Sequence, residues 1–294
     1  MKPPPFQYFD PDTLEQALEL VATKDNAKVL AGGQSLMPML NMRYAQPDHI
    51  IDLNRIPGLN AIRENDGGLS IGAMTRQRDL EFSPVVRERC PLMHEALLNV
   101  GHRQTRNRGT LGGSLCHLDP AAELAAVAMA YDATIEVRSR SGAREIPMAE
   151  FPAFYMTPAI QPDEIVTGVR FALWPRGHAS AFLEFSRRHG DFAIASVAVL
   201  IELDDDRQPR RASITVSGLT HKPERIAEAE GLICAGPPTE DRVRQAAAAC
   251  GALAATGDVH ASASYRQHLA RTLAFRCVTM ALQRAGLGAP EPRS

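Results

Sequence analysis

Two glycine pairs, each followed closely by a serine, are the residues of this chain best suited to chemistry. They lie within Ala31–Leu36 and Thr110–Leu115, and each follows an apolar stretch where a turn is expected. Glycine lets the backbone approach a ligand closely and adopts the positive φ angles that turn successive N–H groups inward. A diphosphate needs several such donors, and a serine hydroxyl adds another. The two pairs together predict two loops of one diphosphate site, although neither has the G-x-G-x-x-G pattern.

Charged residues surround the second glycine pair. Arg106 and Arg108 precede it and are either ordinary exposed charges or groups that neutralise a bound anion. Asp119 precedes a proline at the expected start of a helix, so it either caps that helix or bonds a ribose or ribityl hydroxyl. Cys116 and His117 lie between them, and they either pack in the interior or touch a ligand.

The sequence contains no recognisable set of catalytic or metal-binding side chains. His189, Gly190 and Asp191 could act in acid–base catalysis, but a glycine turn between strands explains them equally well. The five cysteines are dispersed without C-x-x-C spacing, which is typical of reduced thiols rather than of disulfides or an iron–sulfur cage. There is no G-x-S-x-G or H-E-x-x-H motif. Difficult chemistry would therefore come from a bound cofactor that the protein positions.

Length and composition indicate a globular protein of more than one domain. The chain has 294 residues, of which 45% are hydrophobic and 22% charged, with a formal net charge of -2. This charge argues against a nucleic-acid partner recognised through its phosphates. No apolar run is long enough to span a membrane, and the first residues lack the apolar core of a signal peptide. We expect a cytoplasmic protein without a metal site of its own.

The residue patterns predict an α+β protein with three domains, at 1–57, 58–176 and 177–288, and a short tail at 289–294. The first domain is a small α/β unit. Its apolar residues recur at helical spacing over 12–24, and two short apolar runs predict strands. These strands cover 28–31 and 48–53, and the first of them leads directly into the first glycine pair.

The second and third domains are expected to combine antiparallel strands with helices. In the second we expect strands over 59–62, 68–72, 133–138 and 164–171, with a hairpin turn at 64–67 and helices over 76–81, 91–99 and 120–130. In the third we expect strands over 192–203 and 211–216, separated by a charged turn at 204–206, and helices over 224–234, 239–255 and 262–285. The third domain has no glycine pair, so the predicted diphosphate site belongs to the first two.

These landmarks resemble the FAD-binding medium subunit of molybdenum hydroxylases, the carbon monoxide dehydrogenase and xanthine dehydrogenase family of flavoproteins. The resemblance rests on the segments 31–36, 106–114, 119–120, 162–166 and 187–193, in that order along the chain, and it extends over about residues 4–286. It implies a two-part FAD-binding domain of the vanillyl-alcohol-oxidase (PCMH) type. A C-terminal sheet-and-helices domain of the CO dehydrogenase flavoprotein type would follow.

The resemblance also implies a set of FAD ligands. The first loop would bind the diphosphate through backbone N–H groups, the second would complete the cradle, and two further residues would meet the FAD hydroxyls and the flavin's pyrimidine edge. In that order the residues are Ala31, Gly32, Gly33, Gln34, Ser35 and Leu36; Thr110, Gly113 and Ser114; Asp119; and Ile165. The stretch 182–186 lacks the lysine that the family often carries before the arginine pair at 187–188.

The family further implies that the chain is one part of an electron relay. Electrons would leave a molybdopterin centre in a large subunit, cross [2Fe-2S] clusters in a small subunit and reach FAD here, from which an external acceptor takes them. A dimer of such heterotrimers is the expected assembly. One alternative is a self-sufficient flavin dehydrogenase or oxidase of the same fold. Another is a flavin-free docking scaffold, which the glycine loops argue against because glycines cost backbone entropy without a ligand.

Overall fold

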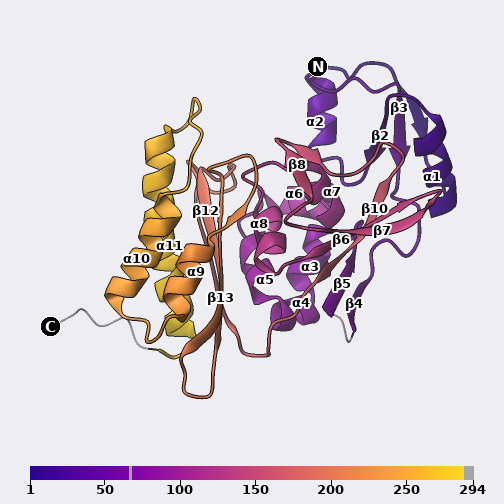
Figure 1. Ribbon diagram of the computed structural model, residues 1–294. Helices are drawn as coiled ribbons and strands as arrows, with labels where there is room; N and C mark the ends of the chain where they lie inside the picture. Colours follow the sequence, from indigo (N-terminus) through magenta and orange to yellow (C-terminus); the bar gives the residue numbers. More distant parts are fainter. Residues whose placement is uncertain (66–67, 288–294) are drawn as a thin grey trace. The chain divides into compact units, whose positions relative to one another are not determined.

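The computed structural model describes residues 1–65 and 68–287 of this chain, and Figure 1 traces its elements. The chain forms two compact units, each assembled from separate segments. Unit 1 consists of Met1–Phe82, His102–Leu118 and Ala133–Ala172, and unit 2 of Ser83–Gly101, Asp119–Asp132 and Leu173–Ser294. The mixture of helix and sheet agrees with the expected α+β class. The three-domain division at residues 57, 176 and 288 stays a prediction, and the tail at 289–294 lies outside the described residues.

Unit 1 begins with a small parallel sheet and one helix. The strands β1 (Gln7–Phe9), β2 (Ala27–Leu30) and β3 (His49–Asp52) pair in the order β1-β3-β2, and α1 (Leu14–Thr23) connects the first two. The side chain of Thr13 accepts a hydrogen bond from the Gln16 N–H and so caps α1. Ala17 and Leu18 are buried on one face of this helix, as their spacing predicted. The expected helix and two strands are thus confirmed, and β1 is an addition.

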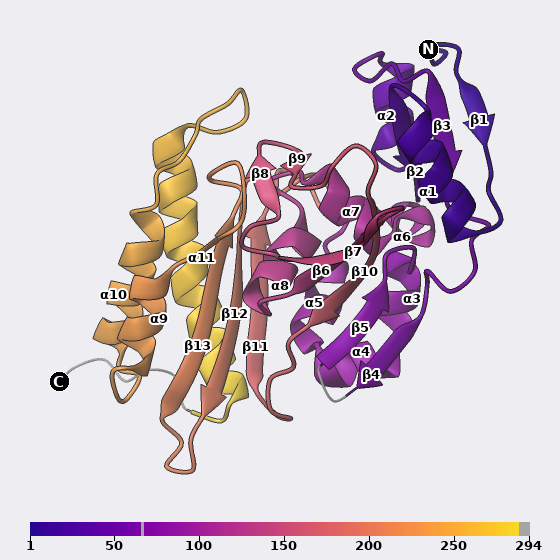
Figure 2. The same cartoon turned by 45° about the vertical axis from the view of Figure 1, so that its right-hand side comes forward.

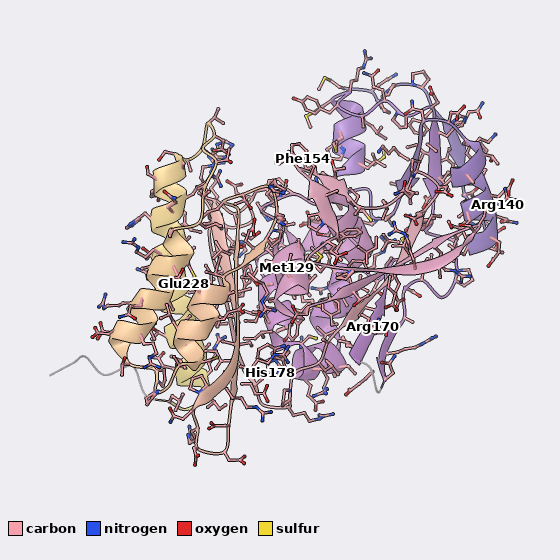
Figure 3. All side chains as sticks on the ribbon, in the orientation of Figure 1. Met129, Arg140, Phe154, Arg170, His178 and Glu228 are labelled. Atoms are coloured by element: carbon pink, nitrogen blue, oxygen red, sulfur yellow. The ribbon has the colours of Figure 1, made fainter. Side chains whose placement is uncertain are left out.

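The second sheet of unit 1 has five antiparallel strands in the order β4-β5-β10-β6-β7. The strands are β4 (Ile62–Asn65), β5 (Gly68–Gly72), β6 (Thr134–Ser139), β7 (Gly142–Pro147) and β10 (Ile165–Phe171). On the turn between β6 and β7, Arg140 forms an ion pair of 2.9 Å with Glu19 on α1, and Figure 3 labels this arginine. This ion pair links the five-stranded sheet to the helix of the small sheet.

The strand that we expected over 59–62 is wrong, because the chain there forms a turn and β4 begins only at Ile62. Leu59 is apolar because it is buried in the core, and its carbonyl accepts a hydrogen bond from the Met74 N–H at 2.7 Å. A buried side chain in a turn leaves the same apolar signal as a strand. The expected hairpin turn at 64–67 includes Asp66 and Gly67, which lie outside the described residues.

Unit 1 also contains short helices and a small hairpin. These are α2 (Leu36–Asn41), α3 (Gln77–Phe82), α6 (Arg103–Arg108), α7 (Leu111–His117), β8 (Pro152–Phe154) and β9 (Thr157–Pro158). Phe154, labelled in Figure 3, is 68% exposed near the tip of the β8–β9 hairpin. The second glycine pair lies inside α7, so the loop that we predicted there is wrong. Gly112 sits in this helix because a Cβ at that position would be 2.6 Å from the Cβ of Ala73.

Unit 2 is built around a four-stranded antiparallel sheet, β11-β12-β13-β14. Figure 2 shows the helices α9, α10 and α11 beside this sheet. Its elements are β11 (Ala179–Phe185), β12 (Ala195–Leu203), β13 (Pro209–Ser217), β14 (Glu224–Arg225), α4 (Pro84–Arg89), α5 (Pro91–Leu97), α8 (Glu123–Ala130), α9 (Ala227–Cys234), α10 (Glu240–Gly251) and α11 (Ala263–Arg284). The two expected strands and the three expected C-terminal helices are confirmed, with shifted ends.

The sheet of unit 2 is buried on both faces, which explains why β12 is apolar throughout. Ile214 and Val216 on β13 face the core formed with α9–α11. The alternate residues of β13 are serine and threonine, and they meet the other helical layer. Ser213 donates a hydrogen bond to the Ala130 carbonyl of α8 at 2.9 Å, and Ser217 donates one to the Pro120 carbonyl at 2.7 Å. Period-two alternation therefore assigns each face of the sheet to one set of helices.

Candidate cofactor site

The first glycine pair lies on the loop that connects β2 to α2 in unit 1. Among the described residues, the backbone N–H groups of Gly32, Gly33, Gln34, Ser35 and Leu36 have no hydrogen-bond acceptor. Gln34 is exposed, and the other four residues are buried or half-buried. Backbone donors with little exposure are nearly always paired, so this run of unpaired donors indicates a ligand or solvent at the loop. These donors belong to five of the six loop residues predicted from the sequence.

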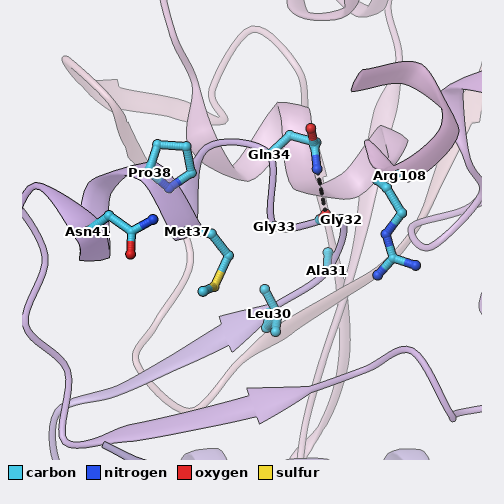
Figure 4. A pocket seen from close by; sticks show the side chains of 9 residues that line it. All are labelled: Leu30, Ala31, Gly32, Gly33, Gln34, Met37, Pro38, Asn41 and Arg108. Carbon is cyan, nitrogen blue, oxygen red and sulfur yellow. Dashed lines mark hydrogen bonds between the residues drawn. The ribbon is translucent and has the colours of Figure 1, made fainter. Parts of the chain in front are cut away.

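A pocket of about 440 Å³ opens beside this loop, and Figure 4 shows its lining. Apolar side chains from β2 and α2 form one part of the wall, and the glycine loop forms another. The lining residues are Leu30, Ala31, Gly32, Gly33, Gln34, Met37, Pro38, Asn41 and Arg108. The pocket therefore combines unpaired backbone donors, an apolar wall and one guanidinium group, a combination that suits an anionic group attached to an organic ring system.

The two glycines of this loop are required for different reasons. At Gly32, a Cβ would overlap the carbonyl oxygen of Arg108 and lie 2.8 Å from the Cα of Gly109. Gly33 has φ +73°, in the left-handed region that favours glycine. The close approach at Gly32 joins this loop to the end of α6, and the turn at Gly33 points the chain into α2.

The second motif lies next to the first, but its backbone donors are already used. The Gly113 N–H donates to the Thr110 Oγ1 at 3.1 Å, and the Ser114 N–H donates to the Thr110 carbonyl at 3.1 Å. These bonds cap α7. A Cβ at Gly113 would be 3.4 Å from the Cβ of Ala31, so the two glycine motifs are neighbours in unit 1. Here the hydroxyl groups of Thr110 and Ser114, rather than backbone N–H groups, are the donors left for a ligand.

The two arginines before the second motif have different environments. Arg106 is 8% exposed, and its Nε lies 2.9 Å from the Glu81 carboxylate. Burial raises the pKa of Glu81, but the hydrogen bonds and charges of Arg106 and, after it, of Arg78 outweigh this effect and hold the pKa below its usual value. The charge of Arg106 is therefore balanced by a carboxylate within the fold. Arg108, in contrast, is exposed and lines the pocket.

The remaining predicted ligands are placed separately. Ile165 begins β10 and is 2% exposed in the core shared with α1, so its backbone alone could meet a ligand. Asp119 belongs to unit 2, where its carboxylate accepts a hydrogen bond from the Ala121 N–H at 2.9 Å. Of the two alternatives for Asp119, the helix cap is wrong, because α8 begins at Glu123 and its N-cap is Ala122. The local turn satisfies the carboxylate instead.

Two other candidate residues from the sequence, Cys116 and Asp191, interact with the protein itself. Burial raises the pKa of the Cys116 thiol to about 12, so this thiol stays protonated and unreactive. Asp191 lies 3.9 Å from Arg187 in an exposed ion pair. Within residues 1–65 and 68–287 no group of three potential metal-ligating side chains converges. In the same residues no helix is long and apolar enough to cross a membrane.

Unit 2 also holds two neighbouring carboxyl groups, one buried and one half-buried, that the sequence patterns did not indicate. Burial raises the pKa of Glu123 on α8 to about 8, and the nearby charges of Glu184 and Asp119 raise it further. Burial likewise raises the pKa of Glu184 on β11 to about 7. The one available signal was the position of Glu123 within an otherwise apolar, alanine-rich helix. Arg76 and Asn54, which lie beside the end of α6, had no local sequence signal at all.

Comparison with known families accounts for both parts of the chain. Residues 4–174 match the family described as the FAD binding domain in molybdopterin dehydrogenase. Residues 180–281 match the CO dehydrogenase flavoprotein C-terminal domain. The first match covers the glycine loop, the pocket and both predicted motifs.

Individual relatives agree over nearly the whole chain. It is 42% identical to the 6-hydroxypseudooxynicotine dehydrogenase complex subunit alpha of Paenarthrobacter nicotinovorans over 97% of each protein. It is 38% identical to the nicotine 6-hydroxylase medium subunit of the same organism, over 96% of this chain and 99% of that protein. The structure is similar to a chain of carbon monoxide dehydrogenase from Hydrogenophaga pseudoflava, with a TM-score of 0.93, 33% identity and coverage of 97% and 99%. The chain therefore belongs to the family of FAD-binding medium subunits of molybdenum hydroxylases, as its sequence motifs indicated.

Proposed function

We propose that this chain holds FAD with the diphosphate on the loop Ala31–Leu36, and that it is the electron-transfer subunit of a heteromeric molybdenum hydroxylase. The observation that carries the FAD site is the run of five unpaired backbone N–H groups from Gly32 to Leu36, on a loop whose residues Gly32, Gly33 and Gln34 line a pocket of about 440 Å³. Backbone N–H groups of this kind bind a phosphate through several hydrogen bonds, although the groups themselves carry no formal charge.

The other ligands in this proposal have distinct chemical roles. The hydroxyl groups of Thr110 and Ser114 donate to phosphate oxygens, while Gly113 leaves room for the diphosphate. The backbone of Ile165 bonds the pyrimidine edge of the flavin, and the carboxylate of Asp119 accepts from hydroxyl groups of FAD. The burial of the Ile165 side chain in the core supports a backbone role at that position.

In the proposed relay, FAD is the electron carrier, and it can accept and give up electrons singly or in pairs. The electrons come from [2Fe-2S] clusters of a small partner subunit and leave to an external acceptor. A large subunit carries the molybdopterin centre, and two such heterotrimers associate. The names of the relatives support a multi-subunit enzyme, since one is a complex subunit and another a medium subunit. We also propose that this assembly is cytoplasmic.

We propose that the substrate is selected by another subunit. The relatives belong to enzymes named for substrates as different as nicotine and carbon monoxide, although their chains align with this one over nearly the full length. A shared fold that serves such different substrates supports a common electron-transfer role for this chain.

The test is an absorption spectrum of the purified full chain, followed by mild denaturation and identification of the released chromophore. The proposal predicts an oxidised flavin spectrum and one FAD released per chain. Expression together with candidate iron–sulfur and molybdenum subunits from the same genome should yield a complex in which substrate reduces the flavin. A folded, colourless chain that cannot be reconstituted with FAD would contradict the proposed site.

A further inference from the structure

Arg108 is placed beside the glycine loop by two backbone contacts. Its carbonyl oxygen touches the position that a Cβ on Gly32 would occupy, and the same oxygen accepts a hydrogen bond from the Arg76 Nη1. Of the nine described residues that line the pocket, Arg108 is the single charged one. Figure 4 shows its side chain running alongside Ala31 and Gly32, across the loop from Asn41.

In the part of the chain that the structure describes, no carboxylate forms an ion pair with the guanidinium group of Arg108. Arg106, two residues earlier on α6, shows the contrast, since it is buried against Glu81 at 2.9 Å. An unpaired arginine in open solvent is ordinary, but one that lines a pocket of unpaired N–H donors adds to the same positive potential.

Arg76 adds a second cation behind the first. Its Nη2 donates to the Asn54 Oδ1, and the Asn54 amide donates to the Ala31 carbonyl at 2.9 Å, so Arg76 connects the end of α6 to the glycine loop. Burial, and then the charge of Arg108, lower the pKa of Arg76, while the charges of Asp79 and Asp52 raise it to a smaller extent. Among the described residues Arg76 also has no carboxylate partner within ion-pair distance. Two neighbouring guanidinium groups repel each other, and a bound anion would relieve that repulsion.

We propose that the Arg108 guanidinium group binds and neutralises the diphosphate of FAD, and that Arg76 is a positioning residue that holds Arg108 and the glycine loop together. This inference rests on the proposed FAD site and adds the side chain that makes the site prefer a diphosphate. Arginine suits this role because its planar fork can donate two parallel hydrogen bonds to one phosphate. The site should therefore favour FAD over FMN, which has a monophosphate and no adenylate.

The experiment measures FAD affinity of the full apoprotein by quenching of flavin fluorescence, at low and at high salt. Arg108→Met keeps the aliphatic stem and removes the charge, so it should weaken FAD binding about 10- to 100-fold, as expected for a hydrogen bond to a charged group. Arg108→Lys keeps the charge without the fork and should lie between that variant and the wild type. Arg103→Ala, an exposed arginine on the same helix that does not line the pocket, is the matched control and should change affinity less than about twofold.

Salt dependence separates a phosphate contact from a structural effect. Screening weakens charge contacts, so the salt sensitivity of FAD affinity should be smaller in Arg108→Met than in the wild type and unchanged in Arg103→Ala. Arg76→Gln keeps hydrogen-bonding capacity but loses the charge, and it should lower the preference for FAD over FMN. If Arg108→Met binds FAD with the affinity and salt dependence of Arg103→Ala, the role of Arg108 is overturned while the FAD site stands. If the wild type binds no FAD, both proposals fail.

Discussion

The carbonyl oxygen of Arg108 occupies the space that a Cβ atom on Gly32 would need, and the Cα of Gly109 would be 2.8 Å from that atom. The loop after β2 and the end of α6 therefore meet backbone to backbone, nearly eighty residues apart in the sequence. This contact brings the pocket-lining guanidinium group of Arg108 beside the unpaired N–H groups of the loop. Both halves of the proposed diphosphate site depend on residue 32 having no side chain.

We predict that Gly32→Ala weakens FAD binding and lowers the free energy of unfolding by about 1–3 kcal/mol, because the added methyl group pushes the two backbones apart. Urea denaturation and an FAD titration measure the two effects. The matched control is Gly231→Ala on α9, where a Cβ would meet nothing within 4 Å. This control should raise stability by about 0.5–1 kcal/mol, since alanine is favoured over glycine in a helix, and should not change FAD binding.

An unchanged FAD affinity in folded Gly32→Ala would contradict the close approach as a requirement of the site. A valine at residue 33 is a less direct test. The φ of +73° strains any L side chain there, and a Cβ would lie 3.2 Å from Met37 and 3.3 Å from Leu30. A loss of FAD binding in Gly33→Val would therefore have two causes that this variant does not separate, the strain of the backbone and the filling of space needed by the ligand.

Arg106 and Arg108 on α6 should respond differently to the same substitution. Arg106→Met leaves the buried Glu81 carboxylate without this partner, and breaking a buried pair costs about 3–5 kcal/mol of stability. Arg108→Met, at an exposed position, should change the free energy of unfolding by less than about 0.5 kcal/mol. Chemical denaturation of both variants measures the difference. Equal stability of the two variants would show that the Arg106–Glu81 pair does not stabilise the fold.

Thr110 should contribute both to stability and to FAD binding. Thr110→Ala removes the oxygen that accepts from the Gly113 N–H, and loss of such a helix cap costs about 1 kcal/mol. It also removes a hydroxyl donor at the site, so FAD affinity should fall. Thr110→Ser keeps the hydroxyl and should restore most of both properties. Failure of serine to rescue the affinity would indicate that the threonine methyl group, not the hydroxyl, matters here.

The buried carboxyl groups of unit 2 predict a pH dependence of stability. The pKa of Glu123 is raised to about 8 and that of Glu184 to about 7, so the folded chain retains protons that the unfolded chain releases at lower pH. Since the folded state binds more protons between about pH 5 and pH 8, the free energy of unfolding should fall as pH rises through this window. Thermal unfolding at several pH values measures this fall.

Two substitutions test the assignment of this pH effect. Glu123→Gln removes one of the two groups and should flatten the pH dependence. Glu228→Gln changes an exposed glutamate on α9, labelled in Figure 3, and should leave the pH dependence as in the wild type. A fall of the same size in both variants would contradict the role of Glu123.

Local patterns predicted the fold around the first glycine pair well. The short apolar run before Gly32, the glycine pair itself and the amphipathic spacing of α1 each depend on neighbours in the sequence. They correctly indicated a strand, a close-approach loop and a helix. The family resemblance then identified the cofactor, which the glycines alone could not, because any diphosphate would suit them.

Other features depend on contacts between distant segments, and the sequence patterns missed them. Gly112 belongs to a glycine pair typical of a loop, but it lies in a helix because it packs against Ala73. Leu59 belongs to an apolar run typical of a strand, but it lies in a turn because its side chain fills the core. Whether Arg106 or Arg108 faces the pocket depends on Glu81, twenty-five residues earlier. Such choices follow from tertiary packing, which local propensity does not contain.

The central claim is that the N–H groups of Gly32 to Leu36 bind the FAD diphosphate, and amide hydrogen exchange of the full chain tests it most directly. Mass spectrometry of a peptide spanning these residues is compared between apoprotein and FAD-saturated protein, with flavin absorbance confirming occupancy. We predict rapid exchange without FAD and marked protection with it, because each N–H then gains an acceptor. A peptide from α10 serves as the control and should be unaffected. Unchanged exchange at Gly32 to Leu36 in a chain saturated with FAD would contradict the account.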